Sequence, residues 1–114
     1  MPAAKPKRKS GWLWNQPLPE FDWDDPEDER GNYVHATRHG VSADEIEEAF
    51  SYDLQRSLPS KNPRNREERA VLFSRTTDNA PVVVVYTMRN GQIRPISAHW
   101  ASASESKLMR KWER

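Results

Sequence analysis

Histidine and arginine side chains give this chain the chemistry needed to transfer protons and to hold a phosphate ester. Histidine can act as an acid or a base near neutral pH, and arginine binds phosphate oxygens in a bidentate way. The chain has three histidines and no cysteine, which excludes disulfides and thiolate metal sites. The residues that are candidates for catalysis by proton transfer or phosphate contact are His99, Arg94, His39, Glu68 and Arg69.

His99 is the strongest of these candidates because of its position. It stands at the end of a predicted strand, two residues from Ser97 on the same face, and a predicted helix begins directly after it. A helix N-terminus attracts anions. A strand-end histidine can also simply bond a nearby carbonyl, so both interpretations stay open. His39 is equally ambiguous, because a cationic imidazole that ends a helix would be stabilised by the helix dipole.

The other candidates have structural as well as functional interpretations. Arg94 is expected opposite Thr87, and Arg69 lies on the preceding strand. Both could contact phosphate, or both could belong to the solvated face of a sheet. The Glu67–Glu68 pair could supply a base or could anchor Arg69.

A metal site is not expected. His35 and His39 are four residues apart and could share a metal ion on one helix face. Zinc sites of this kind require three or four convergent ligands, and the sequence names no third one. We therefore expect neither a metal ion nor another cofactor.

The composition predicts one domain behind a basic arm. At 114 residues, with 35% hydrophobic and 31% charged residues, the chain can bury one small core. Residues 1–20 hold four of the nine prolines and a lysine- and arginine-rich cluster, which is typical of a flexible arm. Trp12 and Trp14 in this arm could stack bases, dock on a partner or cover a sheet edge. The domain itself is expected over residues 21–114.

The charge distribution and hydropathy constrain partners and location. Residues 20–29 hold seven acids, whereas residues 56–75 hold six basic residues and two acids. This separation could present a basic face to nucleic acid, an acidic face to a basic partner, or only solvated surface. No signal peptide or transmembrane segment is predicted, and the absence of cysteine is compatible with a cytoplasmic protein.

Local signals predict two helices in the first half of the domain. The alternation in "FDWD" indicates a short strand, and Asp25 followed by Pro26 resembles the start of a helix that would run to His39. Gly31 weakens the middle of this helix, so its regular part could begin only near Asn32. Gly40 suits a left-handed helix cap. Ser42 with Glu45 forms a capping box for the next helix.

The second half predicts an antiparallel sheet and a final helix. Residues 52–58 form a weak strand, "RAVLFSR" and "PVVVVYTMR" are strong ones, and "NG" at residues 90 and 91 predicts a type I′ hairpin. In the simple register, Tyr86 pairs with Pro95, whose missing N–H faces a sheet edge or a partly paired neighbour. A capping box at Ser102 and Glu105 opens the last helix. The prediction is an α+β domain: about four antiparallel strands, two N-terminal helices and one C-terminal helix.

These segments together resemble the BrnT family of bacterial type II toxins. The resemblance rests on "FDWD", "RHGVS" before the acidic "ADEIEEAF", "EERAVLF", a hairpin and "IRPISAHWASASE", from Phe21 to about Trp112. It implies a RelE-like fold, metal-independent endonucleolytic cleavage of RNA, and a small DNA-binding antitoxin with which the toxin forms a hetero-oligomer. The RNA-contacting residues predicted on this basis are Arg38, Arg89, Trp100 and Lys107.

The end of the last strand departs from the family's usual pattern. His99 stands where the family commonly has arginine, and Trp100 where it often has lysine. The loss of two cations supports an alternative, a non-catalytic module that keeps the toxin fold and binds a protein partner or nucleic acid. In the simple hairpin register, moreover, Arg94 and His99 lie on opposite faces. Only a bulge or twist near Pro95 would bring them to one site.

Overall fold

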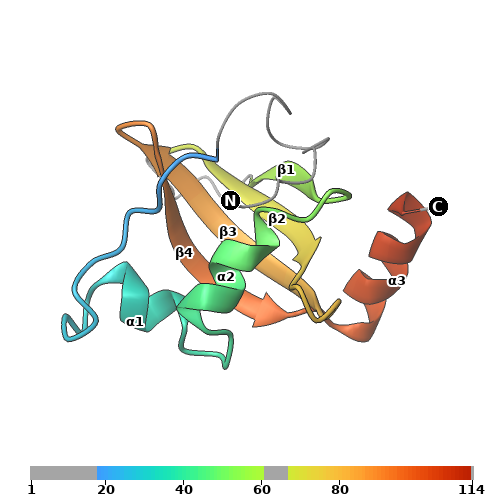
Figure 1. Cartoon of the computed structure of the whole chain (residues 1–114), viewed down its shortest axis with the longest axis horizontal. Helices are drawn as coiled ribbons and strands as arrows, with labels where there is room; N and C mark the ends of the chain where they lie inside the picture. Colours follow the sequence, from blue (N-terminus) through green and yellow to red (C-terminus); the bar gives the residue numbers. More distant parts are fainter. Residues whose placement is uncertain (1–17, 61–66, 114) are drawn as a thin grey trace, which may run out of the picture.

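A four-stranded antiparallel sheet of order β1-β2-β3-β4 forms the centre of the computed structural model, which describes residues 18–60 and 67–113 (Figure 1). The predicted α+β class and the order of two helices, strands and a helix are confirmed. The arm predicted over residues 1–20 lies outside the described residues except for its last three. The elements are α1 (Asn32–Ala36), α2 (Ala43–Ala49), β1 (Arg56–Ser60), β2 (Arg69–Arg75), β3 (Pro81–Arg89), β4 (Gln92–Trp100) and α3 (Ala103–Trp112).

The main core lies between α2 and one face of the sheet. Ile46 of α2 and Phe50, which follows it, are fully buried against Leu72, Val84 and Ile93 from three different strands. Phe50 also makes edge contacts with the rings of Phe21 and Tyr86. Each fully buried side chain of this size contributes about 1.5–3 kcal/mol to stability. Figure 1 shows α2 lying across this face of the sheet.

The opposite face, called the outer face below, is partly covered by α3. Trp112 packs edge-on against Phe73 of β2, with ring centroids 5.2 Å apart, and the Arg56 guanidinium lies over the same indole. At the end of α3, Glu113 accepts hydrogen bonds from the Arg75 guanidinium at 2.9 and 3.0 Å. These contacts hold α3 at the end of the sheet remote from the β3–β4 turn (Figure 1).

The β3–β4 hairpin follows the predicted register only near its turn. Asn90 and Gly91 both have positive φ, as a type I′ turn requires, and the pairs from Arg89↔Gln92 to Tyr86↔Pro95 are confirmed. Beyond them the predicted pairing is wrong, because Val85 pairs with Ser97 and Ile96 is left as the extra residue of a β-bulge.

Burial explains the bulge. The simple register would turn His99 toward the α2 core and the apolar Ala98 away from it. With the bulge, Ala98 pairs with Val84 and is 1% exposed, while His99 stays in solvent. Burying an imidazole without a hydrogen-bond partner is unfavourable, and the bulge avoids this burial.

Of the helix expected between Pro26 and His39, the alternative start near Asn32 is confirmed and the end at His39 is wrong. Only Asn32–Ala36 is helical, and residues 25–31 form turns in which Asp25 and Asp28 accept backbone N–H groups two residues later, at 2.9 and 3.0 Å. Aspartate competes for local backbone donors in this way and therefore favours turns over helix. Gly40 does have the expected positive φ, but it follows a turn at Thr37–His39 and not the helix itself.

Both predicted capping boxes are confirmed. Ser42 and Glu45 exchange hydrogen bonds at the start of α2, at 2.9 and 3.1 Å. Ser102 and Glu105 do the same at the start of α3, at 2.8 and 3.2 Å. The weak strand expected over residues 52–58 is displaced, since β1 occupies Arg56–Ser60.

The "FDWD" segment runs beside β4 but forms only one isolated parallel bridge, Phe21↔Ile93. The Asp22 N–H donates to the Ile93 carbonyl at 2.7 Å, and the Ile93 N–H donates to the Glu20 carbonyl at 2.8 Å. Pro95 has no N–H for the next bond, so the ladder stops there. β4 is thus the partly paired edge that Pro95 predicted.

Asn32 replaces the missing ladder bonds with its side-chain amide. Its Nδ2 group donates to the Asp22 carbonyl at 2.9 Å and to the Pro95 carbonyl at 2.8 Å. Its Oδ1 accepts the Asp24 N–H, and its own N–H donates to the Asp24 carboxylate, both at 2.8 Å. With 6% exposure, Asn32 joins the N-terminal segment, α1 and β4 at one buried point.

Replacing Asn32 with alanine should therefore destabilise the fold by about 2–4 kcal/mol, because several buried backbone groups lose their partner. Urea unfolding followed by circular dichroism measures the change. Lys111→Ala on the exposed side of α3 is the control and should change the unfolding free energy by less than about 0.5 kcal/mol. Equal effects of the two substitutions would contradict the role given to Asn32.

Candidate functional site

The bulge at Ile96 places Arg94 and His99 on the same face of the sheet. Arg94 pairs with Thr87 and His99 with Val83, two β3 residues four positions apart whose side chains share the outer face. Four pairing steps separate the Cα atoms of Arg94 and His99 by about 13 Å along the strand. The bulge near Pro95, which the sequence left as a possibility, is present. It removes the objection that Arg94 and His99 lie on opposite faces of the sheet.

A row of polar side chains crosses the outer face at the Arg94 end. Ala70 pairs with Tyr86, so Arg69 follows opposite Thr87, which in turn pairs with Arg94. Adjacent strands are about 4.8 Å apart, so the two arginines of this row are about 10 Å apart at the backbone. Val85 and Ser97 lie between this row and His99.

His99 is held by a carboxylate at the start of α3. Its Nε2 lies 3.0 and 3.2 Å from the two carboxylate oxygens of Glu105, and Glu105 Oε1 also accepts the Ser102 N–H at 2.8 Å. Partial burial acts to raise the pKa of Glu105, but the hydrogen bonds from Ser102 and His99 outweigh it and lower this pKa. Glu105 therefore remains ionised and orients the imidazole.

This pair has the form of a histidine base with an orienting carboxylate. When Nε2–H donates to Glu105, the proton-accepting lone pair is on Nδ1. The imidazole side chain is 47% exposed, so a substrate can reach it. The capping-box pattern identified Glu105 in the sequence as a helix cap. Its contact with His99 depends on the turn between β4 and α3, which the sequence pattern does not predict.

Arg94 is engaged within the protein. Its guanidinium donates to both oxygens of the Asp24 carboxylate at 3.0 and 2.7 Å and lies 3.5 Å from Asp22. The hydrogen bond from Arg94, and after it the one from the Asn32 N–H, lower the pKa of Asp24 from 3.8 to about 2. Arg94 therefore fixes the N-terminal segment to β4, and its predicted phosphate contact stays a prediction.

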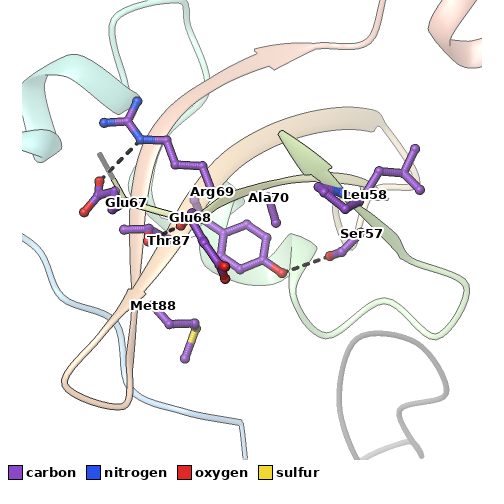
Figure 2. A pocket seen from close by; sticks show the side chains of 10 residues that line it. Ser57, Leu58, Glu67, Glu68, Arg69, Ala70, Thr87 and Met88 are labelled. Atoms are coloured by element: carbon purple, nitrogen blue, oxygen red, sulfur yellow. Dashed lines mark hydrogen bonds and ion pairs between the residues drawn. The ribbon is translucent and has the colours of Figure 1, made fainter. Parts of the chain in front are cut away.

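Glu67 bridges the two other arginines of this end of the outer face. Its carboxylate lies 3.3 Å from Arg69 Nε and 3.4 Å from Arg89 Nη2. Figure 2 shows Arg69 reaching toward Glu67, and both line a hollow of about 460 Å³ together with Glu68, Tyr86 and other residues. Of the adjacent glutamates, Glu67 is the one that anchors Arg69.

The remaining predicted residues lie apart from the His99–Glu105 pair. Trp100 projects from the other face of β4, is 37% exposed, and donates from Nε1 to the Gly40 carbonyl at 3.3 Å. Arg38 and His39 are exposed in the turn after α1, and Lys107 is exposed on α3. His35 and His39 do not share a helix, because α1 ends at Ala36. In the part of the chain that the structure describes, no three or more histidine or acidic side chains gather as metal ligands.

A family model for the ribonuclease toxin BrnT, of type II toxin–antitoxin systems, matches residues 23–105. The chain belongs to the BrnT family. The matched region contains the whole sheet, the N-terminal segment from Trp23 and the His99–Glu105 pair. A ribonuclease toxin of a type II system has a cognate antitoxin as its partner.

Two further comparisons give no relative. No curated protein and no solved structure matches the chain. Among residues 18–60 and 67–113, no helix is long and apolar enough to cross a membrane. The BrnT assignment therefore rests on the family model, and the sequence-based resemblance to this family is confirmed.

The Arg94–Asp24 pair predicts a specific loss of stability in acid. Because the folded-state pKa of Asp24 is about 2 and the ordinary value is 3.8, the stabilisation is present above about pH 4 and is lost as the pH falls toward 2. Asp24→Asn should be less stable than the original protein at pH 5, and this difference should shrink between pH 4 and pH 2. Urea unfolding at a series of pH values measures it. Asp78→Asn, which removes a carboxylate from an exposed turn, is the control. A stability difference for Asp24→Asn that does not change with pH would contradict the role given to the Arg94–Asp24 pair.

Proposed function

We propose that the protein cleaves internal phosphodiester bonds of RNA without a metal ion. His99 would be the base and Glu105 its positioning residue. The observation that carries the proposal is the hydrogen-bonded His99–Glu105 pair on the same face as Arg69 and Arg94. His99 would take the proton of a 2′-hydroxyl, whose oxygen then attacks the adjacent phosphorus. The bond to the 5′-oxygen breaks, and this oxygen leaves with a proton from an acid.

His39 is the candidate for that acid. It precedes Gly40, whose carbonyl accepts a hydrogen bond from Trp100 on the face of β4 opposite to His99. His39 is therefore near the same end of β4 as His99 but beside the opposite face of the sheet, so its role as the acid requires the RNA strand to pass around the β4 edge. A second histidine is suited to donate a proton near neutral pH.

Arg69 and Arg89 are the proposed phosphate contacts. Both already face Glu67 in partly exposed ion pairs, and ion pairs at a protein surface contribute only about 0–1 kcal/mol. A phosphate can therefore replace the carboxylate at small cost, and it offers the bidentate acceptor geometry that arginine prefers. Arg94, Arg38, Trp100 and Lys107 remain proposed RNA contacts, and Glu68 remains a proposed catalytic group.

We further propose that the cognate antitoxin carries a DNA-binding domain, that it forms a hetero-oligomer with this toxin, and that the pair acts in the cytoplasm.

The alternative function is RNA or protein binding without cleavage. One observation favours it: the charge of Arg94 is already compensated by Asp24 and Asp22. Cleavage assays with purified protein separate the two functions, since only the first converts RNA to shorter products.

His99→Ala should lower the rate of RNA cleavage by about 10²–10⁴-fold, the contribution of one general base. Glu105→Gln should keep the capping box, because glutamine also fits that position, while it removes the negative charge beside His99. Its cleavage rate should fall and its pH profile should shift to a different midpoint. Lys111→Gln is the control for an exposed change on α3. Full activity of His99→Ala, or an unchanged pH profile of Glu105→Gln, would defeat the proposed roles.

Cleavage should persist after metal removal. The proposed mechanism uses only side-chain proton transfer and phosphate contacts, so excess EDTA should change the cleavage rate by less than about twofold. Gel analysis of a labelled RNA with and without EDTA measures this. Loss of cleavage that is restored by added Mg²⁺ or Mn²⁺ would rule out the metal-independent mechanism.

A further inference from the structure

A hollow of about 280 Å³ lies beside the β4 edge, between α1 and the bulge. We call it the basic hollow. Its lining includes Arg30, Asn32, His35, Arg38, Arg94 and Ile96, with Glu29 as its one carboxylate. Arg30 was not recognised from the sequence as an RNA contact, because it comes from a turn with no periodic pattern of its own.

Two cations of the basic hollow are uncompensated within the described structure. Neither Arg30 nor Arg38 forms an ion pair in residues 18–60 and 67–113, and both side chains are exposed. Arg94 differs, because Asp24 and Asp22 already face it. The hollow thus offers two available guanidinium groups and a histidine ring N–H against a single glutamate.

The walls of the hollow are held in place by buried contacts. Asn32 fixes the start of α1 to β4 through the Pro95 carbonyl, 2.8 Å from its Nδ2. Gly31 packs so closely that a Cβ there would lie 2.7 Å from the Asp24 Cβ. Ile96 lines the hollow as the extra residue of the bulge. The cationic side chains therefore project from a preorganised backbone, which lowers the entropic cost of binding.

We infer that the basic hollow binds a phosphodiester group of the RNA strand, to one side of the bond that faces His99. This inference rests on the proposed function. Arg94 belongs both to the lining of the hollow and to the row with Arg69 and Thr87, so the two surfaces are continuous. The strand would pass from the outer face around the β4 edge. Guanidinium groups on such a path contact backbone phosphate and position the strand without reading its sequence.

The test uses a 2′-O-methyl oligoribonucleotide, which has no 2′-hydroxyl to react and so reports binding without cleavage. Arg30→Gln combined with Arg38→Gln should weaken binding roughly tenfold or more through the lost charge-assisted hydrogen bonds. The slope of log affinity against log salt should become shallower by about 0.7, the value for one phosphate on a single strand. Fluorescence anisotropy at several salt concentrations measures both.

Arg110→Gln combined with Lys111→Gln is the matched control, because it removes the same charge from the exposed side of α3. Its effects should be clearly smaller in both measurements. If the two double variants change affinity and slope equally, only the net charge matters and the inference is overturned. Absence of RNA cleavage by the original protein would instead defeat the proposed catalysis and leave this comparison valid.

Shortening the oligonucleotide gives a second readout. As nucleotides are removed from one end, the affinity should fall abruptly at the length at which the strand no longer reaches the basic hollow. The Arg30→Gln and Arg38→Gln double variant should lack this abrupt step. A step that persists unchanged in the variant would overturn the placement. Inorganic phosphate is the probe for a free-anion site, and its competition with full-length and shortened oligonucleotides is compared. If phosphate lowers the affinity of both to the same extent, the hollow is not on the RNA path.

Discussion

The side-chain amide of Asn32 stands in for backbone hydrogen bonds that Pro95 cannot make, and the arrangement of the β4 edge depends on it. The amide donates to carbonyls of both the N-terminal segment and β4 while its oxygen accepts the Asp24 N–H. A buried polar network of this kind is stabilising only when each member is satisfied. Because it is, the segment that begins with Phe21 and the short helix α1 have one position relative to the sheet.

The same proline precedes the bulge that determines which side chains share a face. One extra residue at Ile96 changes the alternation of β4, so that Ala98 enters the core and His99 leaves it. The outer face thereby gains a histidine in line with its arginines. A packing requirement of the core thus decides the composition of the candidate site on the opposite side of the sheet.

The cations of the outer face are compensated to different degrees. Glu67 lies against Arg69 and Arg89 in partly exposed pairs, which salt and competing anions weaken easily. Arg94 is held through two hydrogen bonds by Asp24, and this arrangement is more costly to displace. Phosphate is therefore expected to bind first where compensation is weak. Arg94 would act chiefly by holding the N-terminal segment in place.

The sequence alone determined the features that depend on neighbouring residues: the Asn90–Gly91 turn, both capping boxes, the order of helices and strands, and the family. Tertiary structure alone decided the bulge, the end of α1 at Ala36 and the pairing of His99 with Glu105. The physical reason is that turns and caps are closed by bonds within a few residues. The register of a strand, in contrast, depends on which of its side chains the core can bury. That core is built from segments distant in the sequence, so it forms only when they pack together.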